Sequence, residues 1–199
     1  MRTIVAFDFD GTLTKKDSFL RFITFSKGKT QLYLSLPYIL ILWGLFKVKI
    51  LKRQYAKEAI FSYFFKGMSI EDFDTDCRAF SKDIDVILRA KVKEKIAEYL
   101  KQDCKLVIVS ASIENWIKPW ALKNNIEMIV STQAEVNASG KITGKFKTLN
   151  CVGQEKVNRF LEAFPNREDY KLIVYGDSDG DKELMALANE SHFNYFKAQ

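Results

Sequence analysis

Short apolar runs alternate with amphipathic segments along most of the chain. Four runs have the length of buried parallel strands, and each is followed by a turn: residues 3–9, 105–110, 127–131 and 171–175. Four segments show the apolar spacing of amphipathic helices: residues 90–101, 113–124, 155–163 and 181–189. Strands and helices that alternate in this way predict an α/β fold, with a parallel sheet and helices on both of its faces.

Residues 15–85 interrupt this alternation. They contain no strand-like run bounded by turns, but several stretches with helical spacing. We therefore expect a Rossmann-like α/β core made of residues 1–14 and 86–199, with an all-helical cap inserted as residues 15–85. Within the core, residues 134–146 are predicted to form a small hairpin that turns at residues 137–140.

Composition narrows the classes of protein and of metal site. With 199 residues, 47% hydrophobic and 28% charged, the chain is typical of a globular core domain with a modest insertion. Its one histidine, His192, argues against catalytic triads and multi-histidine metal sites, so any metal should be bound by carboxylate oxygen, which favours Mg²⁺ over Zn²⁺. Cys77, Cys104 and Cys151 match neither a zinc site nor a CxxC pair. With no visible signal peptide, we expect them to be small buried side chains of a cytoplasmic protein.

Two aspartates follow the first predicted strand. Asp8 and Asp10 are two residues apart and therefore face the same side, at the carboxyl edge where open α/β sheets place their active sites. Gly11 lets the backbone turn sharply and exposes its N–H to an anion. Adjacent carboxylates repel, but a divalent metal could offset this, neutralise a phosphate and leave one carboxylate as a nucleophile. The alternative interpretation is a pair of aspartates that cap a turn.

Two further polar positions are predicted at the same edge of the sheet. Ser110, Ala111 and Ser112 end the second strand, where a hydroxyl and backbone N–H groups can hold phosphate oxygens beside a helix N-terminus. Alternatively, Ser110 or Ser112 only caps that helix. Lys156 opens a later helix, from which its ammonium can reach a phosphate, although it could equally be a surface lysine.

The last predicted strand runs into three aspartates within five residues. Asp177 and Asp181 belong to this segment, whose acidic density is typical of a metal site. A calcium-binding loop that began at Asp177 would need glycine and glutamate where the chain has Lys182 and Ala188, so that site is excluded.

These motifs occur in a recognisable order: DxDGT at residues 8–12, Ser110, Lys156 and GDxxxD at residues 176–181. The whole chain resembles the haloacid dehalogenase (HAD) superfamily, most specifically in the first and last of these motifs. The resemblance implies that Asp8 is a nucleophile that forms an aspartyl-phosphate and that Asp10 is the general acid and base. It also implies a set of phosphate-binding residues, which are Gly11, Thr12, Ser110, Ala111 and Lys156. For Mg²⁺ it implies Asp8, Asp177 and the backbone carbonyl of Asp10, with Asp181 as a supporting residue.

The helical insertion after the first motif resembles the phosphoserine-phosphatase-like subgroup. In that subgroup a glutamate nine residues beyond the nucleophile binds the substrate amine, and this chain has the shorter Asp17 there. A cap arginine binds the substrate carboxylate, for which Arg53 is the candidate. The departure at Asp17 argues against phosphoserine itself as the substrate.

The sequence therefore predicts a Mg²⁺-dependent phosphomonoester hydrolase that acts on a small phosphorylated metabolite. One alternative is a membrane-surface phosphatase that acts on a lipid phosphate, such as a phosphatidylglycerophosphate-type substrate. A non-enzymatic alternative is a degenerate binding module, but the complete set of motif residues argues against it.

Basic residues are concentrated in the predicted cap. Residues 15–66 hold 11 Lys or Arg and 2 Asp or Glu, in a chain of net charge +6. Nucleic acid is not expected as a partner, because the segment lacks a groove-reading motif.

Residues 32–46 of the predicted cap include 12 apolar residues of 15. As a helix they would span about 22 Å, which is short of the roughly 30 Å hydrocarbon core of a bilayer. The sequence leaves three interpretations of this segment open: a buried cap helix, a dimer contact or an interfacial helix. In the third case residues 27–53 would bind an anionic membrane, and the protein would be peripheral at its inner face.

Overall fold

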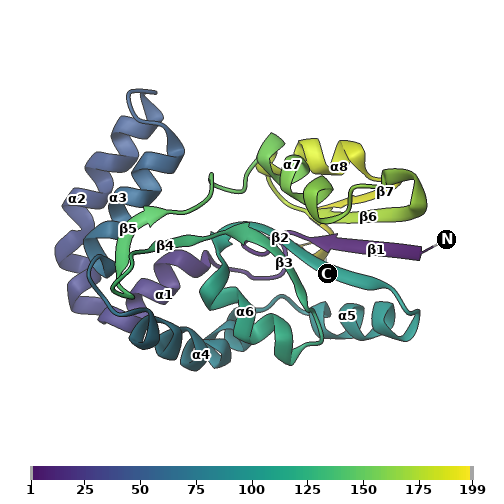
Figure 1. Ribbon diagram of the computed structural model, residues 1–199, viewed down its shortest axis with the longest axis horizontal. Coiled ribbons are helices and arrows are strands. Elements are labelled where there is room, and N and C mark those ends of the chain that lie inside the picture. Colours follow the sequence, from purple (N-terminus) through teal and green to yellow (C-terminus); the bar gives the residue numbers. More distant parts are fainter. Residues whose placement is uncertain (1, 198–199) are drawn as a thin grey trace.

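A five-stranded parallel sheet forms the centre of the computed structural model, which describes residues 2–197 (Figure 1). Its strands lie in the order β3-β2-β1-β6-β7, and each neighbouring pair is parallel. Their bounds are β1 (Arg2–Phe7), β2 (Lys105–Ile113), β3 (Met128–Thr132), β6 (Tyr170–Gly176) and β7 (Glu190–Phe193). The four predicted strands are present. The fifth, β7, was not predicted, because its four residues are polar or half-exposed and form no apolar run.

Helices cover both faces of the sheet, which confirms the predicted α/β fold. On one face lie α5 (Val92–Lys101) and α6 (Glu114–Lys123), and on the other lie α7 (Gln154–Ala163) and α8 (Lys182–Leu187) (Figure 1). Strand β1 contributes alternate side chains to the two cores: Val5 and Phe7 pack on the α5–α6 side, and Ile4 and Ala6 on the α7–α8 side. Burial on both faces explains why β1 is continuously apolar.

Four helices separate β1 from α5 in the chain. They are α1 (Ser18–Lys27), α2 (Lys29–Lys47), α3 (Arg53–Phe65) and α4 (Ile70–Ile87). Aromatic rings join this helical insertion to the α/β part: the ring of Phe22 lies 5.0 Å from that of Trp116 on α6 and 5.4 Å from that of Phe73. The two parts therefore share one hydrophobic core. The division at residues 15 and 85 stays a prediction.

The hairpin predicted at residues 134–146 is present, and it packs against the insertion. Its strands are β4 (Ala134–Val136) and β5 (Ile142–Phe146), and the N–H of Gly140 donates to Asn137 in the turn. The N–H of Gly67 donates to the carbonyl of Ile142 at 2.8 Å, so β5 lies beside the end of α3 (Figure 1). Three short 3₁₀ turns complete the described chain: η1 (Arg167–Asp169), η2 (Asp179–Asp181) and η3 (Tyr195–Lys197).

The three cysteines differ in burial. Cys77 and Cys151 are buried and free, as predicted. Cys104 is only half-buried, so the prediction was wrong for this residue. It lies in the turn between α5 and β2, where the chain runs over the surface before it enters the sheet.

Candidate active site

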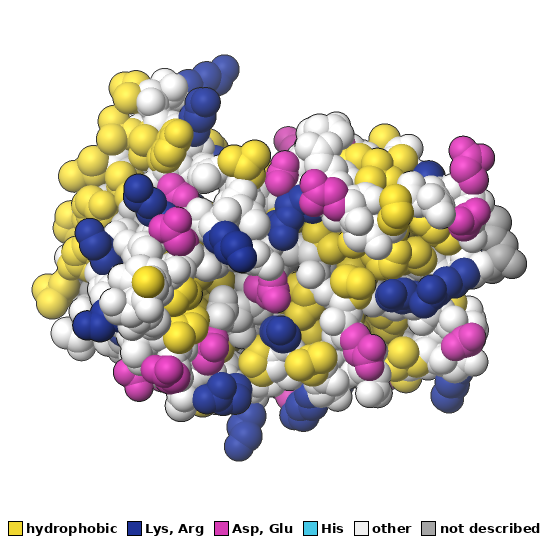
Figure 2. Space-filling view, viewed as in Figure 1, with side chains coloured by type: hydrophobic (Ala, Val, Ile, Leu, Met, Phe, Trp, Pro, Cys, Tyr) yellow, Lys and Arg dark blue, Asp and Glu magenta, His cyan; other side chains and the backbone are white. Residues whose placement is uncertain are grey.

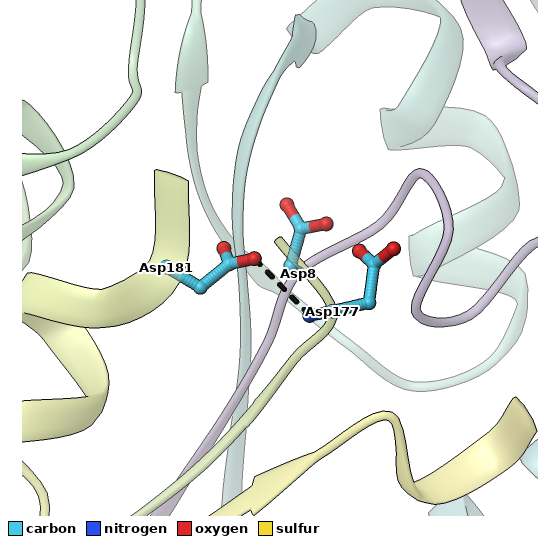
Figure 3. A group of neighbouring side chains, drawn as sticks. All are labelled: Asp8, Asp177 and Asp181. Atoms are coloured by element: carbon cyan, nitrogen blue, oxygen red, sulfur yellow. Dashed lines mark hydrogen bonds between the residues drawn. The ribbon is translucent and has the colours of Figure 1, made fainter. Parts of the chain in front are cut away.

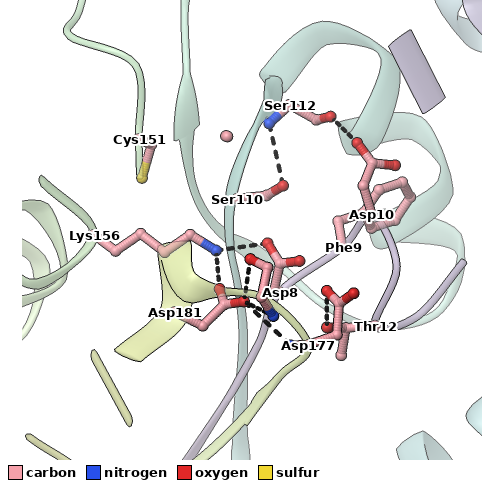
Figure 4. Close-up of polar contacts among 12 residues, drawn as sticks. Asp8, Phe9, Asp10, Thr12, Ser110, Ser112, Cys151, Lys156, Asp177 and Asp181 are labelled. Atoms are coloured by element: carbon pink, nitrogen blue, oxygen red, sulfur yellow. Dashed lines mark hydrogen bonds and ion pairs between the residues drawn. The ribbon is translucent and has the colours of Figure 1, made fainter. Parts of the chain in front are cut away.

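Asp8 lies at the carboxyl edge of the sheet, one residue beyond β1. Its N–H donates to the carbonyl of Tyr175 at 2.9 Å, which continues the β1–β6 ladder and fixes the start of the side chain. The ammonium of Lys156, in the first turn of α7, donates to Asp8 Oδ1 and to Asp181 Oδ1, both at 2.6 Å (Figure 4). The two carboxylates therefore share one cation.

Burial and the shared cation set the ionisation of this group. The side chains of Lys156, Asp8 and Asp181 are only 3%, 10% and 2% exposed. Burial raises the pKa of Asp8 to about 6, against the attraction of Lys156. Burial disfavours the charged form of Lys156, but the carboxylates of Asp8 and Asp181 outweigh it, so its pKa is raised and it stays protonated. The pKa of Asp181 is lowered, because Lys156 and hydrogen bonds outweigh burial.

Asp10 is held apart from this group by hydroxyl and amide donors. Its carboxylate accepts the hydroxyl of Ser112 (Figure 4). It also accepts the N–H of Ser18 at 2.8 Å and the hydroxyl of Ser18 at 3.0 Å. Burial raises the pKa of Asp10 to about 7, and the nearby charge of Asp17 raises it further. A carboxyl group with this pKa can donate and accept a proton near neutral pH.

Asp8, Asp177 and Asp181 form an all-oxygen cluster that fits a hard divalent cation. One carboxylate oxygen of each lies within 4.8 Å of the others (Figure 3). The second oxygen of Asp181 accepts the N–H groups of Asp177 and Ser178, at 3.1 and 3.0 Å, so this residue also shapes the loop. Such a donor set favours Mg²⁺. The carboxylate of Asp10 is not part of this cluster. The resemblance implies that Asp10 binds the metal through its backbone carbonyl.

Gly11 and Thr12 shape the loop under this cluster. Gly11 has φ +86°, and a β-carbon on it would overlap the carboxylate of Asp177, so both backbone and space require glycine. The hydroxyl of Thr12 donates to Asp177 Oδ1 at 3.1 Å, and Lys197 pairs with Oδ2 at 2.8 Å. Neither Gly11 nor Thr12 lines the cavity described next, although both were predicted to bind phosphate.

A cavity of about 560 Å³ opens over Asp8 and Asp10 and is closed on the other side by the helical insertion. Its sheet side includes Ser110, Ala111 and Lys156, as predicted. Asp17 and Arg53 also line it, so the structure brings the predicted specificity residues to the same cavity. The carboxylate of Asp17, however, accepts the N–H of Leu20 at 3.0 Å and caps α1. Most of the rest of the wall is apolar and consists of Phe19, Leu20, Ile39, Trp43, Phe46, Ala56, Ile60 and Val152, while Lys57, Ser112, Ser178 and Gly180 also line it.

Lys57 is a cavity residue that the sequence did not single out. Lys57 lies near the N-terminus of α3. Its ammonium donates to the carbonyl of Ala111 at 2.6 Å and to Asn150 Oδ1 at 3.4 Å. Burial lowers its pKa to about 8, against the attraction of Asp10 and Asp17. The available signal was its spacing: Lys57 lies four residues after Arg53 and therefore on the same helix face. Ser18 was missed as well, because no pattern in the sequence pairs it with Asp10.

A family model for haloacid dehalogenase-like hydrolases matches residues 5–186. The chain belongs to this family. Protein CicA of Caulobacter vibrioides is 32% identical to it over an alignment of 200 residues that covers 98% of this chain and 87% of CicA. The match includes both of the most specific motifs, at residues 8–12 and 176–181, and it confirms the predicted family.

Solved structures share the HAD fold at lower identity. A Bordetella pertussis Tohama I protein of unknown function superposes with a TM-score of 0.84 at 19% identity, and covers 96% of this chain and 89% of its own. A phosphoserine phosphatase, described as a phospho-aspartyl intermediate analogue, has a TM-score of 0.65 at 16% identity, with 96% and 85% covered. The predicted similarity to phosphoserine-phosphatase-like structures is therefore confirmed for the fold.

Proposed function

We propose that this chain is a Mg²⁺-dependent phosphatase that hydrolyses phosphomonoesters through an aspartyl-phosphate on Asp8. The observation that carries the proposal is the placement of Asp8, which lines the cavity between the ammonium of Lys156 and the carboxylate of Asp177. A buried carboxylate that is paired with a cation and opens to a cavity has the properties of a nucleophile. The fold neighbour described as a phospho-aspartyl intermediate analogue supports the same chemistry.

Two carboxylates divide the reaction between them. In the first step an oxygen of Asp8 bonds to phosphorus, the ester P–O bond breaks, and Asp10 gives its proton to the leaving alkoxide. In the second step Asp10 takes a proton from a water molecule, whose oxygen bonds to phosphorus while the bond to Asp8 breaks. Inorganic phosphate leaves, and both side chains return to their first state. The pKa of about 7 suits Asp10 to both steps.

The remaining polar residues bind the phosphate and the metal. Lys156, Ser110 and the backbone of Ala111 lie at the sheet edge of the cavity and can hold phosphate oxygens. Asp8, Asp177 and the carbonyl of Asp10 would hold Mg²⁺, with Asp181 in support. When bound, the ion supplies positive charge that offsets the charge of the phosphate and of Asp8. A binding module that had lost catalysis would not need this complete set.

The polar and apolar parts of the cavity wall indicate which class of substrate the site accepts. A small phosphorylated metabolite of the cytoplasm fits the sheet side, where polar groups converge. The apolar wall favours a second candidate, a phosphomonoester with an apolar group such as a lipid phosphate at the inner face of a membrane. Phosphoserine suits the site less well, because Asp17 caps α1 and most other cap residues in the cavity are apolar.

Turnover of p-nitrophenyl phosphate with and without Mg²⁺ tests the proposal. We expect activity that requires Mg²⁺ and is lost in excess EDTA. Asp8→Asn should abolish turnover, because the amide keeps the shape of the side chain but is not a nucleophile. Asp179→Asn is the matched control, since Asp179 lies in the metal-site loop but its side chain is 90% exposed. Full activity of Asp8→Asn, or activity that survives EDTA, would refute the proposal.

A further inference from the structure

Helix α2 presents a wide apolar face to solvent. Tyr33, Leu34, Leu40 and Ile41 are 64%, 76%, 62% and 63% exposed, and the turn that follows adds Val48 and Ile50 at 64% and 73%. We call these six residues the α2 outer face. Only Ser35 and Leu42 of this helix are buried. Figure 2 shows hydrophobic side chains along the outer edge of the molecule over α2. Contiguous apolar surface of this kind marks an interaction site.

Positive charge surrounds this face. Residues 27–53 contain 6 Lys or Arg and no Asp or Glu. Lys29 precedes the α2 outer face, whereas Lys47, Lys49 and Lys52 lie around its distal end, and all four are exposed. Lys and Arg side chains are visible at that tip in Figure 2. The partner must therefore offer both an apolar layer and negative charge.

We propose that the α2 outer face docks on the surface of an anionic phospholipid bilayer, with its apolar side chains at the boundary between headgroups and acyl chains. Such a surface supplies the apolar layer and the negative charge together. A second copy of this chain fits less well, because a two-fold interface would place the lysines around one face against those around the other. None of the helices within residues 2–197 could span a bilayer.

Docking would place the cavity beside the bilayer. The inner side of α2 supplies Ile39, Trp43 and Phe46 to the cavity wall, while its outer side carries the α2 outer face. Trp43 belongs to the cavity and is still 57% exposed, so the wall continues onto the surface of the helix. If the proposed phosphatase activity holds, its substrate is a phosphomonoester whose apolar chain passes along α2 from the bilayer.

Co-sedimentation of the full chain with vesicles tests the docking. We expect binding to phosphatidylcholine vesicles that contain phosphatidylglycerol, much weaker binding to phosphatidylcholine alone, and release in about 1 M salt, where the Debye length falls to about 3 Å. Leu34→Glu should lower the partitioning onto anionic vesicles about tenfold or more, because it removes apolar contact and adds negative charge. Val86→Glu is the matched control, since Val86 is 74% exposed but lies on α4.

Docking and catalysis are measured separately. Hydrolysis of soluble p-nitrophenyl phosphate by Leu34→Glu should equal that of the wild type, so a loss of vesicle binding alone reports on the surface. Three results would overturn the docking: no binding to anionic vesicles at low salt, equal binding by Leu34→Glu and Val86→Glu, or a stable dimer that Leu34→Glu dissociates. An inactive protein that still binds anionic vesicles would refute the phosphatase and leave the docking intact.

Discussion

At the carboxyl edge of the sheet the chain buries charge, whereas on the outer side of α2 it exposes apolar surface. Lys156 and Asp181 form an ion pair with side chains only 3% and 2% exposed. On α2, Leu34 and Ile41 are 76% and 63% exposed. Both arrangements cost folding free energy, since charges lose hydration when they are buried and apolar groups order water when they are exposed.

The two regions differ in how this cost is offset. At the sheet edge the chain provides its own partners, because Lys156 contacts two carboxylates and Asp181 also accepts backbone N–H groups. On α2 the described chain provides none for the apolar face. A locally unfavourable arrangement points to function in both cases, but the first indicates a catalytic centre and the second indicates an external surface.

The largest expected effect is at the buried ion pair. Lys156→Met should leave the carboxylates of Asp8 and Asp181 without their shared cation, and breaking a buried pair typically costs about 3–5 kcal/mol. Without metal, the free energy of unfolding from urea titration should fall by that order, and turnover should drop about 10²–10³-fold. Lys182→Met is the control. Its pair with Asp179 has the similar length of 2.7 Å, but both side chains are exposed, so little should change.

Asp10→Asn should separate the two chemical steps. Loss of a general acid and base typically slows a reaction about 10²–10⁴-fold. For an alkyl phosphate both steps should slow. For p-nitrophenyl phosphate the leaving group needs little protonation, so a rapid first release of nitrophenolate should remain while steady-state turnover falls. Equal losses in the first turnover of both substrates, seen by stopped flow, would contradict the acid role.

Lys57 should give a smaller, pH-dependent effect. Its folded-state pKa is lowered from 10.5 to about 8, so its positive charge is present below pH 8 and is lost as the pH rises through 8. A substrate phosphate stays dianionic over this range. KM should therefore rise above pH 8 in the wild type. In Lys57→Met it should be about tenfold higher at pH 7 and flat from pH 7 to 9. An identical KM profile in both proteins would remove Lys57 from substrate binding.

The smallest effect is expected for stability at the α2 outer face. Leu34→Glu should change the free energy of unfolding by less than about 0.5 kcal/mol, because an exposed side chain loses little packing. By contrast, Phe73→Ala should cost about 3–5 kcal/mol, since Phe73 is fully buried among the rings of Phe22, Phe61 and Phe65. Thermal unfolding of the two variants measures the difference. A strong destabilisation by Leu34→Glu would mean that α2 is packed in solution.

Local pattern was enough to predict much of the α/β fold. The four longer strands and their helices follow from apolar periodicity, and the placement of Asp8, Asp10 and Asp177 at one edge follows from parallel strands that end together. Strand β7 has no such pattern, because an edge strand is half-exposed. Its place in the sheet depends on pairing with β6 and not on its own composition.

Contacts across long stretches of sequence could not be predicted. Ser18 and Ser112 meet at Asp10 although they are 94 residues apart, and Lys57 reaches Ala111 from the helical insertion. Such pairs depend on how the insertion folds over the sheet edge. The fate of residues 32–46 was also left open by the sequence. The structure shows that only Ser35 and Leu42 of α2 are buried, which argues against a buried cap helix.

The covalent role of Asp8 can be tested by acid quench during turnover of p-nitrophenyl phosphate with Mg²⁺, followed by peptide mass spectrometry. Asp10→Asn is the variant of choice, since its slower second step should let the intermediate accumulate. We predict a phosphoryl group on the peptide that contains Asp8, and none when Asp8→Asn is added. Release of nitrophenolate in the first turnover, with the Asp8 peptide unmodified, would contradict the account.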